Sequence, residues 1–240
     1  MSATPADSIV CLLPGLLCDA SVWASQRADL GRDFQVYIPD FLGLESLDAM
    51  AHRVLDETTG PIWVAGHSMG GRAALDVWRL GGDRVAGLAL IDTGIHALRP
   101  GEAEPRLELV RRAYSEGMGV IADAWLPPML HPDRLGDHAL VDPLRAMILR
   151  ATPAQFEGQQ HALIRRPDAT PFLPHIACPT AVICGRQDAW SPVAQHEAMA
   201  AAIPGAVLTV IEDCGHMSNV ERPAELTAAL RAWIESTLPM

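Results

Sequence analysis

Long apolar runs are missing from this sequence. No stretch of its 240 residues approaches the roughly 18 consecutive apolar residues that a membrane-spanning helix needs. The N-terminal stretch MSATPADSIVCLLPG has neither the basic start nor the long apolar core of a signal peptide. We therefore expect a soluble, cytoplasmic protein without a membrane partner.

Basic residues are scarce as well. The chain has 18 Lys+Arg against 29 Asp+Glu, a formal net charge of −11, and no basic run is longer than two residues. Such a chain repels the phosphate backbone of nucleic acids unless basic side chains gather in one patch. We expect no nucleic-acid partner, and the sequence gives no indication of the oligomeric state.

Cysteine pairs at metal-binding spacing are also absent. The five cysteines, an odd number, are scattered and none forms a CxxC pair. This pattern indicates neither a disulfide framework nor a thiolate metal site. Small buried apolar positions are expected for most of them: Cys11, Cys18, Cys178, Cys184 and Cys214.

What the sequence does contain is a regular alternation of apolar and helix-length segments. The apolar runs cover residues 8–13, 35–39, 61–65, 84–91, 180–184 and 206–211. Nearly continuous apolar runs of this length are typical of parallel strands buried on both faces. The helix-length segments between them cover residues 20–30, 46–57, 69–80, 193–202 and 224–236. This order predicts an α/β fold with a mostly parallel sheet of about six strands and helices on both faces.

Residues 93–175 interrupt the alternation. They contain no convincing strand but several short helical stretches, which we place at residues 104–116, 120–126, 143–151 and 154–164. We interpret this segment as a helical lid inserted into a core formed by residues 1–92 and 176–240, because inserted segments at a sheet edge commonly cover a functional site. The alternative is that these helices only add packing.

Ser68 lies in GHSMG, residues 66–70, which fits the pattern G-x-S-x-G. The bare pattern arises by chance in roughly one chain in ten of this length, because glycine and serine are common. Its surroundings make it more specific, since an apolar run precedes it and a helix-length segment follows. This context predicts a nucleophile elbow, in which the serine takes a strained conformation and Gly66 and Gly70 avoid collisions with neighbouring elements.

A serine hydroxyl needs a base, usually an imidazole that is oriented by a carboxylate. In nucleophile-elbow enzymes the order along the chain is serine, acid, histidine. Asp188 follows the apolar run 180–184, and His216 follows the run 206–211. Because the carboxyl ends of parallel strands meet at one edge of the sheet, we predict that Ser68, Asp188 and His216 come together there.

Other acids and histidines fit this order less well. Asp213 is a rival acid, but its place three residues before His216 favours a role in a turn. Asp40 and Asp92 also follow expected strands, yet neither follows a late strand between the serine and the histidine. The remaining histidines are expected to be surface or structural residues: His52, His67, His96, His131, His138, His161, His175 and His196.

Four stretches together resemble the α/β-hydrolase fold family over nearly the whole chain. They are LLPGLLCDASVW (12–23), GHSMGGRAAL (66–75), CGRQDAWSP (184–192) and DCGHMSNVERP (213–223), similar to that family's oxyanion loop, elbow, acid loop and histidine loop. Within the family the pattern is most similar to small carboxylesterases, to enol-lactone hydrolases and to the menaquinone-pathway lyase.

The sequence departs from the family pattern in its oxyanion loop and in its length. The oxyanion loop has Pro14-Gly15 where the family usually has His-Gly. The stretch after the family's fourth strand is reduced to PDFLGLES, and the usual N-terminal hairpin is missing. We therefore expect an abbreviated member with six core strands. The resemblance implies that the backbone N–H groups of Leu16 and Met69 form the oxyanion hole.

The resemblance also implies a serine hydrolase that cleaves small to medium apolar carboxylic esters through an acyl-enzyme, without cofactor or metal, so that its partner is a small ester-type molecule. Lactones and thioesters stay open as substrates. Two other functions also stay open. One is carbon–carbon cleavage or elimination with the triad as base, and the other is a ligand receptor that hydrolyses its ligand very slowly.

The substrate pocket is the least specific part of the prediction. The lid segment offers Trp125, Leu126, Met129 and Met147 as an apolar lining, although such side chains can equally pack the lid onto the core. Arg72 can hold a substrate carboxylate or pair with a neighbouring acid, and the same two roles stay open for Arg165 and Arg166.

Overall fold

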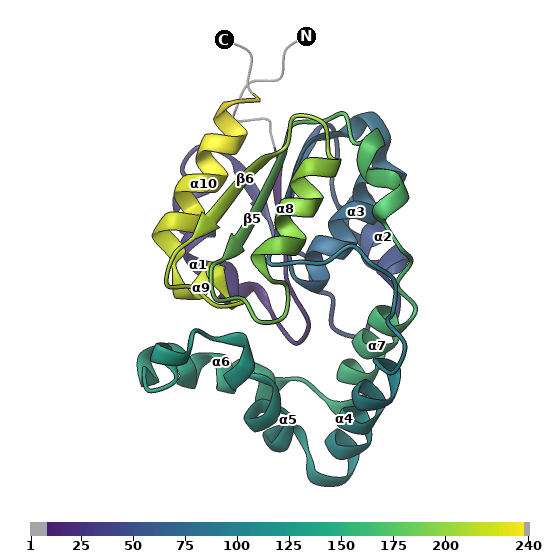
Figure 1. Ribbon diagram of the computed structural model, residues 1–240, viewed down its shortest axis with the longest axis vertical. Helices are drawn as coiled ribbons and strands as arrows, with labels where there is room; N and C mark the ends of the chain where they lie inside the picture. Colours follow the sequence, from purple (N-terminus) through teal and green to yellow (C-terminus); the bar gives the residue numbers. More distant parts are fainter. Residues whose placement is uncertain (1–8, 238–240) are drawn as a thin grey trace.

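A six-stranded parallel sheet forms the centre of the molecule (Figure 1). The structure is a computed structural model that describes residues 9–237. Its strands are β1 (Ile9–Leu13), β2 (Gln35–Tyr37), β3 (Ile62–His67), β4 (Val85–Ile91), β5 (Thr180–Gly185) and β6 (Val207–Ile211), in the spatial order β2-β1-β3-β4-β5-β6. The predicted α/β fold with six core strands is confirmed. Ser8, the first residue of one expected strand, and the chain ends 1–8 and 238–240 lie outside the described residues.

The inner strands are apolar along their whole length because both of their faces are covered. Every residue of β3 and of β5 is buried. All neighbouring strands pair in parallel, so their carboxyl ends lie at one edge. Each residue that a loop places just after a strand therefore comes to this edge.

Helices cover both faces of the sheet. They are α1 (Ala24–Leu30), α2 (Leu47–Glu57), α3 (Met69–Gly81), α8 (Val193–Ala202) and α10 (Pro223–Glu235), with the single-turn α9 (Ser218–Glu221) before α10. In Figure 1, α1 and α10 lie together on one side, whereas α2, α3 and α8 lie on the other. Pro223 takes the first turn of α10, where its missing N–H costs nothing.

Four further helices separate β4 from β5. They are α4 (Ala103–Glu116), α5 (Met118–Trp125), α6 (His138–Arg150) and α7 (Pro153–Ile164), and in Figure 1 they form a group below the sheet. The predicted start of α6 at Pro143 is wrong. The Asp137 side chain accepts hydrogen bonds from the N–H groups of Ala139 and Leu140, which begins the helix earlier and places Pro143 inside it.

The five cysteines are all free; Cys178 is partly exposed and the others are buried. Within residues 9–237, none of the helices combines the length and the apolar character that crossing a bilayer demands.

Candidate active site

Ser68 occupies the sharp turn between β3 and α3. Its backbone has φ 54° and ψ −116°, a conformation that a residue with a side chain rarely adopts. The turn is held from outside, since the Ser68 N–H donates to the Ile91 carbonyl at 2.9 Å and the Thr93 hydroxyl donates to the Ser68 carbonyl at 2.7 Å. The end of the neighbouring strand β4 and Thr93 in the loop that follows it thus maintain a strained serine.

Glycine is required on both sides of this serine. A Cβ at Gly66 would lie 2.2 Å from the Gly70 carbonyl oxygen, and a Cβ at Gly70 would lie 2.3 Å from the Leu13 carbonyl oxygen. The start of α3 therefore packs directly on the backbone of β3 and on the end of β1. This contact is the physical basis of the glycine pattern in the sequence.

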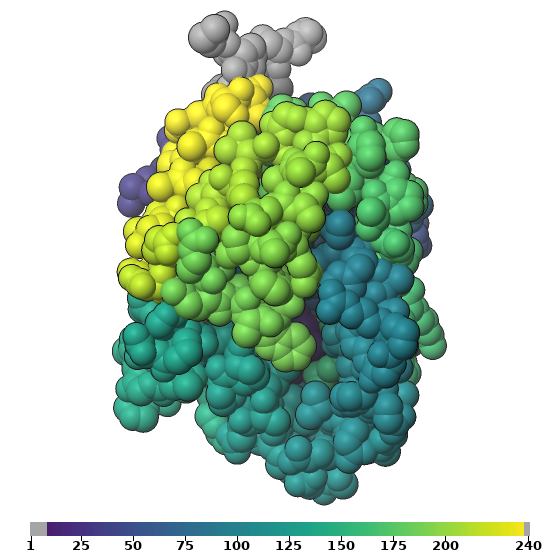
Figure 2. Space-filling view, in the orientation of Figure 1, coloured from purple at the N-terminus to yellow at the C-terminus, as the bar shows by residue number. Residues whose placement is uncertain are grey.

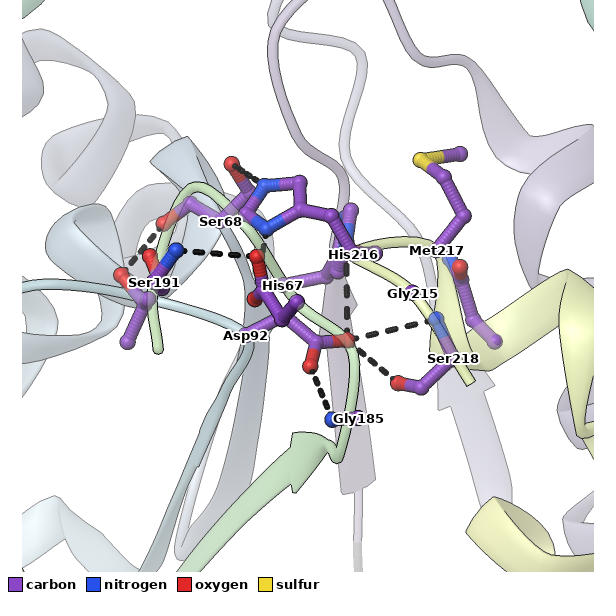
Figure 3. A network of polar contacts seen from close by, with 12 residues as sticks. His67, Ser68, Asp92, Gly185, Ser191, Gly215, His216, Met217 and Ser218 are labelled. Atoms are coloured by element: carbon purple, nitrogen blue, oxygen red, sulfur yellow. Dashed lines mark hydrogen bonds and ion pairs between the residues drawn. The ribbon is translucent and has the colours of Figure 1, made fainter. Parts of the chain in front are cut away.

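Ser68, His216 and Asp188 form one chain of hydrogen bonds. His216 Nε2 lies 2.8 Å from Ser68 Oγ, and His216 Nδ1 lies 2.8 Å from Asp188 Oδ2. Figure 3 shows the serine and the imidazole at this edge of the sheet. Since the carboxylate accepts a hydrogen bond from Nδ1–H, Nε2 is left with its lone pair facing the serine hydroxyl. This is the arrangement in which an imidazole can take a proton from a serine.

Asp188 is held in place by its own loop. Its Oδ1 accepts hydrogen bonds from the N–H groups of Trp190 at 2.8 Å and Ser191 at 2.9 Å. Burial raises the pKa of the Asp188 carboxyl, but the charge and hydrogen bond of His216 and these two N–H donors lower it overall. Conversely, burial lowers the pKa of His216, and the negative charges of Asp188, Asp92 and Glu221 raise it overall.

The rival acids lie elsewhere or act differently. Asp213 is exposed and pairs with Arg222 at 3.1 Å, and exposed Asp40 accepts a hydrogen bond from the Leu42 N–H. Asp92 is fully buried but does not bond to the His216 ring. Of the four acids considered, Asp188 is the one that contacts the imidazole.

Asp92 instead joins the loops that carry the other groups (Figure 3). Its Oδ1 accepts from the Gly185 N–H at 2.9 Å, and its Oδ2 accepts from the Ser218 N–H at 3.3 Å and the Ser218 hydroxyl at 2.5 Å. Burial and the nearby Asp188 charge raise the pKa of Asp92 to about 7. Asp92 thus links the end of β5 to the histidine loop.

His67 lies in the same buried network. Its Nε2 donates to the His216 carbonyl at 2.7 Å, and Nδ1 has no partner among residues 9–237. Burial and the His216 charge lower the pKa of His67 to about 3, so this imidazole is neutral at physiological pH. His196 is buried too, and it accepts a hydrogen bond from the Thr93 N–H at 3.1 Å.

Two backbone N–H groups beside Ser68 are without an acceptor in the part of the chain that the structure describes. Neither Leu16 nor Met69 donates its N–H to another residue of the described chain, and both residues line the cavity that contains Ser68. The loop of Leu16 lies against the elbow, since a Cβ at Gly15 would come within 3.3 Å of Ser68 Cβ. This is where the sequence predicts an oxyanion hole.

A cavity of about 530 Å³ opens in front of Ser68 and His216. In Figure 2 the surface is hollowed between the light-green segment that follows β5 and the blue segment that follows β4. Of the predicted pocket residues, Trp125, Met129 and Arg72 line the cavity. Leu126 and Met147 do not, which corrects the prediction: both are buried in the packing of the helices, and Met147 Sδ accepts a hydrogen bond from the Asp19 N–H.

Comparison with known proteins identifies the family. The family described as "Alpha/beta hydrolase family" matches residues 9–230. This chain belongs to the alpha/beta hydrolase family. The predicted resemblance is thereby confirmed, and the protein is a hydrolase of that family.

Three relatives show how near the likeness is. An esterase from Thermogutta terrifontis, solved with malate bound, has a TM-score of 0.92 and 33% identity, over 98% of this chain and 92% of that one. The enol-lactonase from Burkholderia xenovorans LB400 has a TM-score of 0.87 and 25% identity, with the same two coverages. A pimeloyl-[acyl-carrier protein] methyl ester esterase from Aromatoleum aromaticum is 29% identical over 89% of this chain and 93% of its own length.

Sequence reasoning missed several groups at the site of this hydrolase. Glu221 accepts hydrogen bonds from the N–H groups of Gly215 at 3.0 Å, Met217 at 3.2 Å and His131 at 2.7 Å, which fixes the histidine loop. The His216 N–H donates to the Met129 carbonyl at 2.8 Å. The only hint of this role in the sequence is that Glu221 lies five residues after His216.

The sequence also missed the charge of the cavity. Arg99 and Arg106 line it together with Arg72 and Arg166, whereas the prediction emphasised apolar side chains. Arg99 precedes α4 and Arg106 lies in it, and neither belongs to a motif, so that only the packing of this segment brings them to Arg72 and Arg166.

Proposed function

We propose that this protein is a serine hydrolase that cleaves small to medium carboxylic esters through an acyl-enzyme. Ser68 is the nucleophile, His216 the general base and acid, and Asp188 the group that orients and stabilises the imidazolium. The observation that carries the proposal is the unbroken hydrogen-bond chain, 2.8 Å and 2.8 Å long, which ends in the cavity. Membership of the alpha/beta hydrolase family and the esterases among its relatives support it.

In the first half of the reaction, Ser68 Oγ attacks the ester carbonyl carbon while His216 Nε2 takes the hydroxyl proton. The carbonyl oxygen becomes an oxyanion, which accepts hydrogen bonds from the N–H groups of Leu16 and Met69. The imidazolium then protonates the departing alkoxide as the carbon–oxygen bond breaks. The products of this half-reaction are a free alcohol and an ester between the acyl group and Ser68.

In the second half, water attacks the acyl carbon and His216 takes a proton from that water. The bond between the acyl carbon and Ser68 Oγ breaks, the serine regains its proton from His216, and a carboxylic acid leaves. The chemistry uses only side chains and backbone N–H groups of this chain. Losing one oxyanion donor typically costs about 3 kcal/mol of transition-state stabilisation.

The segment 93–175 acts in this proposal as a lid on a core of residues 1–92 and 176–240. Trp125 and Met129, which lie within it, face the cavity and exclude water from one side of the substrate. The size of the cavity suits a small-molecule ester.

Lactones are the second candidate class. A lactone is a cyclic ester that the same groups can open, and the likeness to an enol-lactonase at 25% identity favours it over thioesters.

The direct test is hydrolysis of p-nitrophenyl acetate and butyrate by the wild type and by Ser68→Ala. We expect kcat to fall at least about 1,000-fold, as for the loss of a triad member in related mechanisms. Ser25→Ala, at an exposed serine of α1, is the matched control and keeps wild-type turnover. Unchanged turnover in Ser68→Ala removes Ser68 from the mechanism.

A further inference from the structure

One wall of the cavity is positively charged, although the chain carries a formal net charge of −11. Four arginines line the cavity: Arg72, Arg99, Arg106 and Arg166. Glu102 is the only Asp or Glu among the cavity-lining residues of the described chain. The sign of the charge in the cavity is therefore opposite to that of the molecule.

Glu102 is already shared by two of these arginines. Its Oε1 accepts hydrogen bonds from Nε of Arg106 at 3.1 Å and Nη2 of Arg106 at 2.9 Å, and its Oε2 accepts from Nη2 of Arg166 at 2.6 Å. Arg106 also donates to Gln160, and Arg166 also donates to the Leu163 carbonyl at 2.7 Å. Arg106 and Arg166 are thus held by the protein itself.

Arg72 forms no hydrogen bond or ion pair with an acid of the described chain. Its Nη1 donates to the His96 carbonyl at 3.0 Å, and its Nε and Nη2 donate to none of residues 9–237. Burial and the positive charge of Arg166 lower the pKa of Arg72, which means that its surroundings oppose its charge. An anion in the cavity would relieve this cost.

Arg72 is also well placed relative to the serine. It lies in the first turn of α3, four residues after Ser68, which directly precedes that helix, and both residues line the same cavity. An anionic group held at Arg72 therefore lies a short chain away from a carbonyl that Ser68 attacks.

We propose that Arg72 binds a carboxylate of the substrate, so that this hydrolase prefers small esters carrying a free carboxylate a few bonds from the cleaved carbonyl. The proposal rests on the proposed function and names its substrate class. A guanidinium offers two parallel N–H donors that match the two oxygens of a carboxylate. A substrate carboxylate would pair with Arg72, which, unlike Arg106 and Arg166, donates no hydrogen bond to an acid among residues 9–237. Arg99 is exposed and solvated.

The test compares monomethyl glutarate with dimethyl glutarate, its neutral counterpart, by following methanol release. We expect the wild-type kcat/KM to be at least about tenfold higher for the monoester, and the ratio to fall as salt screens the contact. A series from monomethyl succinate to monomethyl suberate then locates the best distance between the two groups.

Arg72→Gln removes the charge and keeps much of the side chain. We expect it to lower the monoester-to-diester ratio of kcat/KM by about 10- to 100-fold, the usual loss for a hydrogen bond to a charged group. Arg165→Gln makes the same charge change at an exposed arginine outside the cavity and is expected to keep the wild-type ratio.

Two results overturn the inference: a wild-type ratio near one, or equal losses on both esters in Arg72→Gln. If that variant does not fold, inhibition of the wild type by glutarate but not by glutaramide decides the question, and equal inhibition counts against the inference. The proposed function fails separately, when neither methyl ester nor p-nitrophenyl butyrate shows hydrolysis that depends on Ser68.

Discussion

At the scale of single residues, the site is a set of buried groups whose charges depend on one another. His216 lies between Ser68 and Asp188, and Asp92 lies behind them in the same network. Burial disfavours the imidazolium, but the negative charges of Asp188, Asp92 and Glu221 outweigh burial. The pKa of His216 is therefore above its ordinary value of about 6.5.

The pH dependence of the reaction follows from this shift. A general base must be neutral, so activity is present above the pKa of His216 and is lost as the pH falls through it. For a neutral ester such as p-nitrophenyl butyrate, we expect kcat/KM to rise with pH through an apparent pKa above 6.5. An acid limb with its midpoint clearly below 6.5 would contradict the charge balance described here.

Asp92→Asn tests the network behind the imidazole. Removing this carboxylate removes one of the charges that raise the pKa of His216, so the acid limb is expected to move to lower pH. The change also weakens the hydrogen bonds to Gly185 and Ser218, with an expected loss of about 1–3 kcal/mol in the free energy of unfolding. A residue that only supports the fold would leave the acid limb where it is.

At the scale of elements, the turn from β3 to α3 determines where the serine lies. The turn depends on close backbone contact between α3, the preceding strand and the end of β1. This turn could be predicted from the sequence because the strand, the two glycines and the helix that form it are consecutive in the chain.

Gly70→Ala is expected to disrupt this contact. Its Cβ would lie 2.3 Å from a backbone oxygen, so the helix must move, with an expected loss of at least about 2 kcal/mol in the free energy of unfolding. Gly119→Ala in α5, where no atom lies within 4 Å of the added Cβ, is the matched control and should be neutral or slightly stabilising. Urea denaturation measures the free energy of unfolding of both variants. Equal stabilities would show that the elbow can accommodate a methyl group at position 70.

The limits of sequence reasoning are clearest among the helices of 93–175. Trp125 and Leu126 are both apolar, and the sequence therefore predicted both as pocket residues. Neighbouring residues in a helix point about 100° apart, however, and of these two only Trp125 lines the cavity. The Ser, Asp and His loops could be predicted because each follows a strand at the same edge. Arg99 and Arg106 could not, since their meeting with Arg166 depends on how α4 and α7 pack.

At the scale of the whole molecule, two parts of different character meet at the cavity. One buried core cluster includes residues of the sheet and of all four helices between β4 and β5, but α4, α5 and α6 lie outside the layers that the sheet and its flanking helices form (Figure 1). Contacts between the two parts include the Met129 carbonyl with the His216 N–H and the Gln159 side chain with the Leu17 N–H at 2.8 Å.

This difference predicts unequal local stability. Backbone N–H groups of α4 and α5 are expected to exchange with deuterium faster than those of β3 and β4, since helices outside the sheet layers can open without unfolding the sheet. Hydrogen–deuterium exchange with mass spectrometry measures both sets in one experiment. Equal protection would indicate that the helices and the sheet open as one unit.

The central claim, that His216 activates Ser68 for nucleophilic attack, is tested most directly by fluorophosphonate labelling with peptide mapping. We expect one phosphonyl group per chain, on Ser68, with loss of ester hydrolysis in step with labelling, and labelling at least about 100-fold slower in His216→Ala. A wild-type protein that hydrolyses esters while Ser68 stays unmodified, or that is labelled at another residue, would contradict the account.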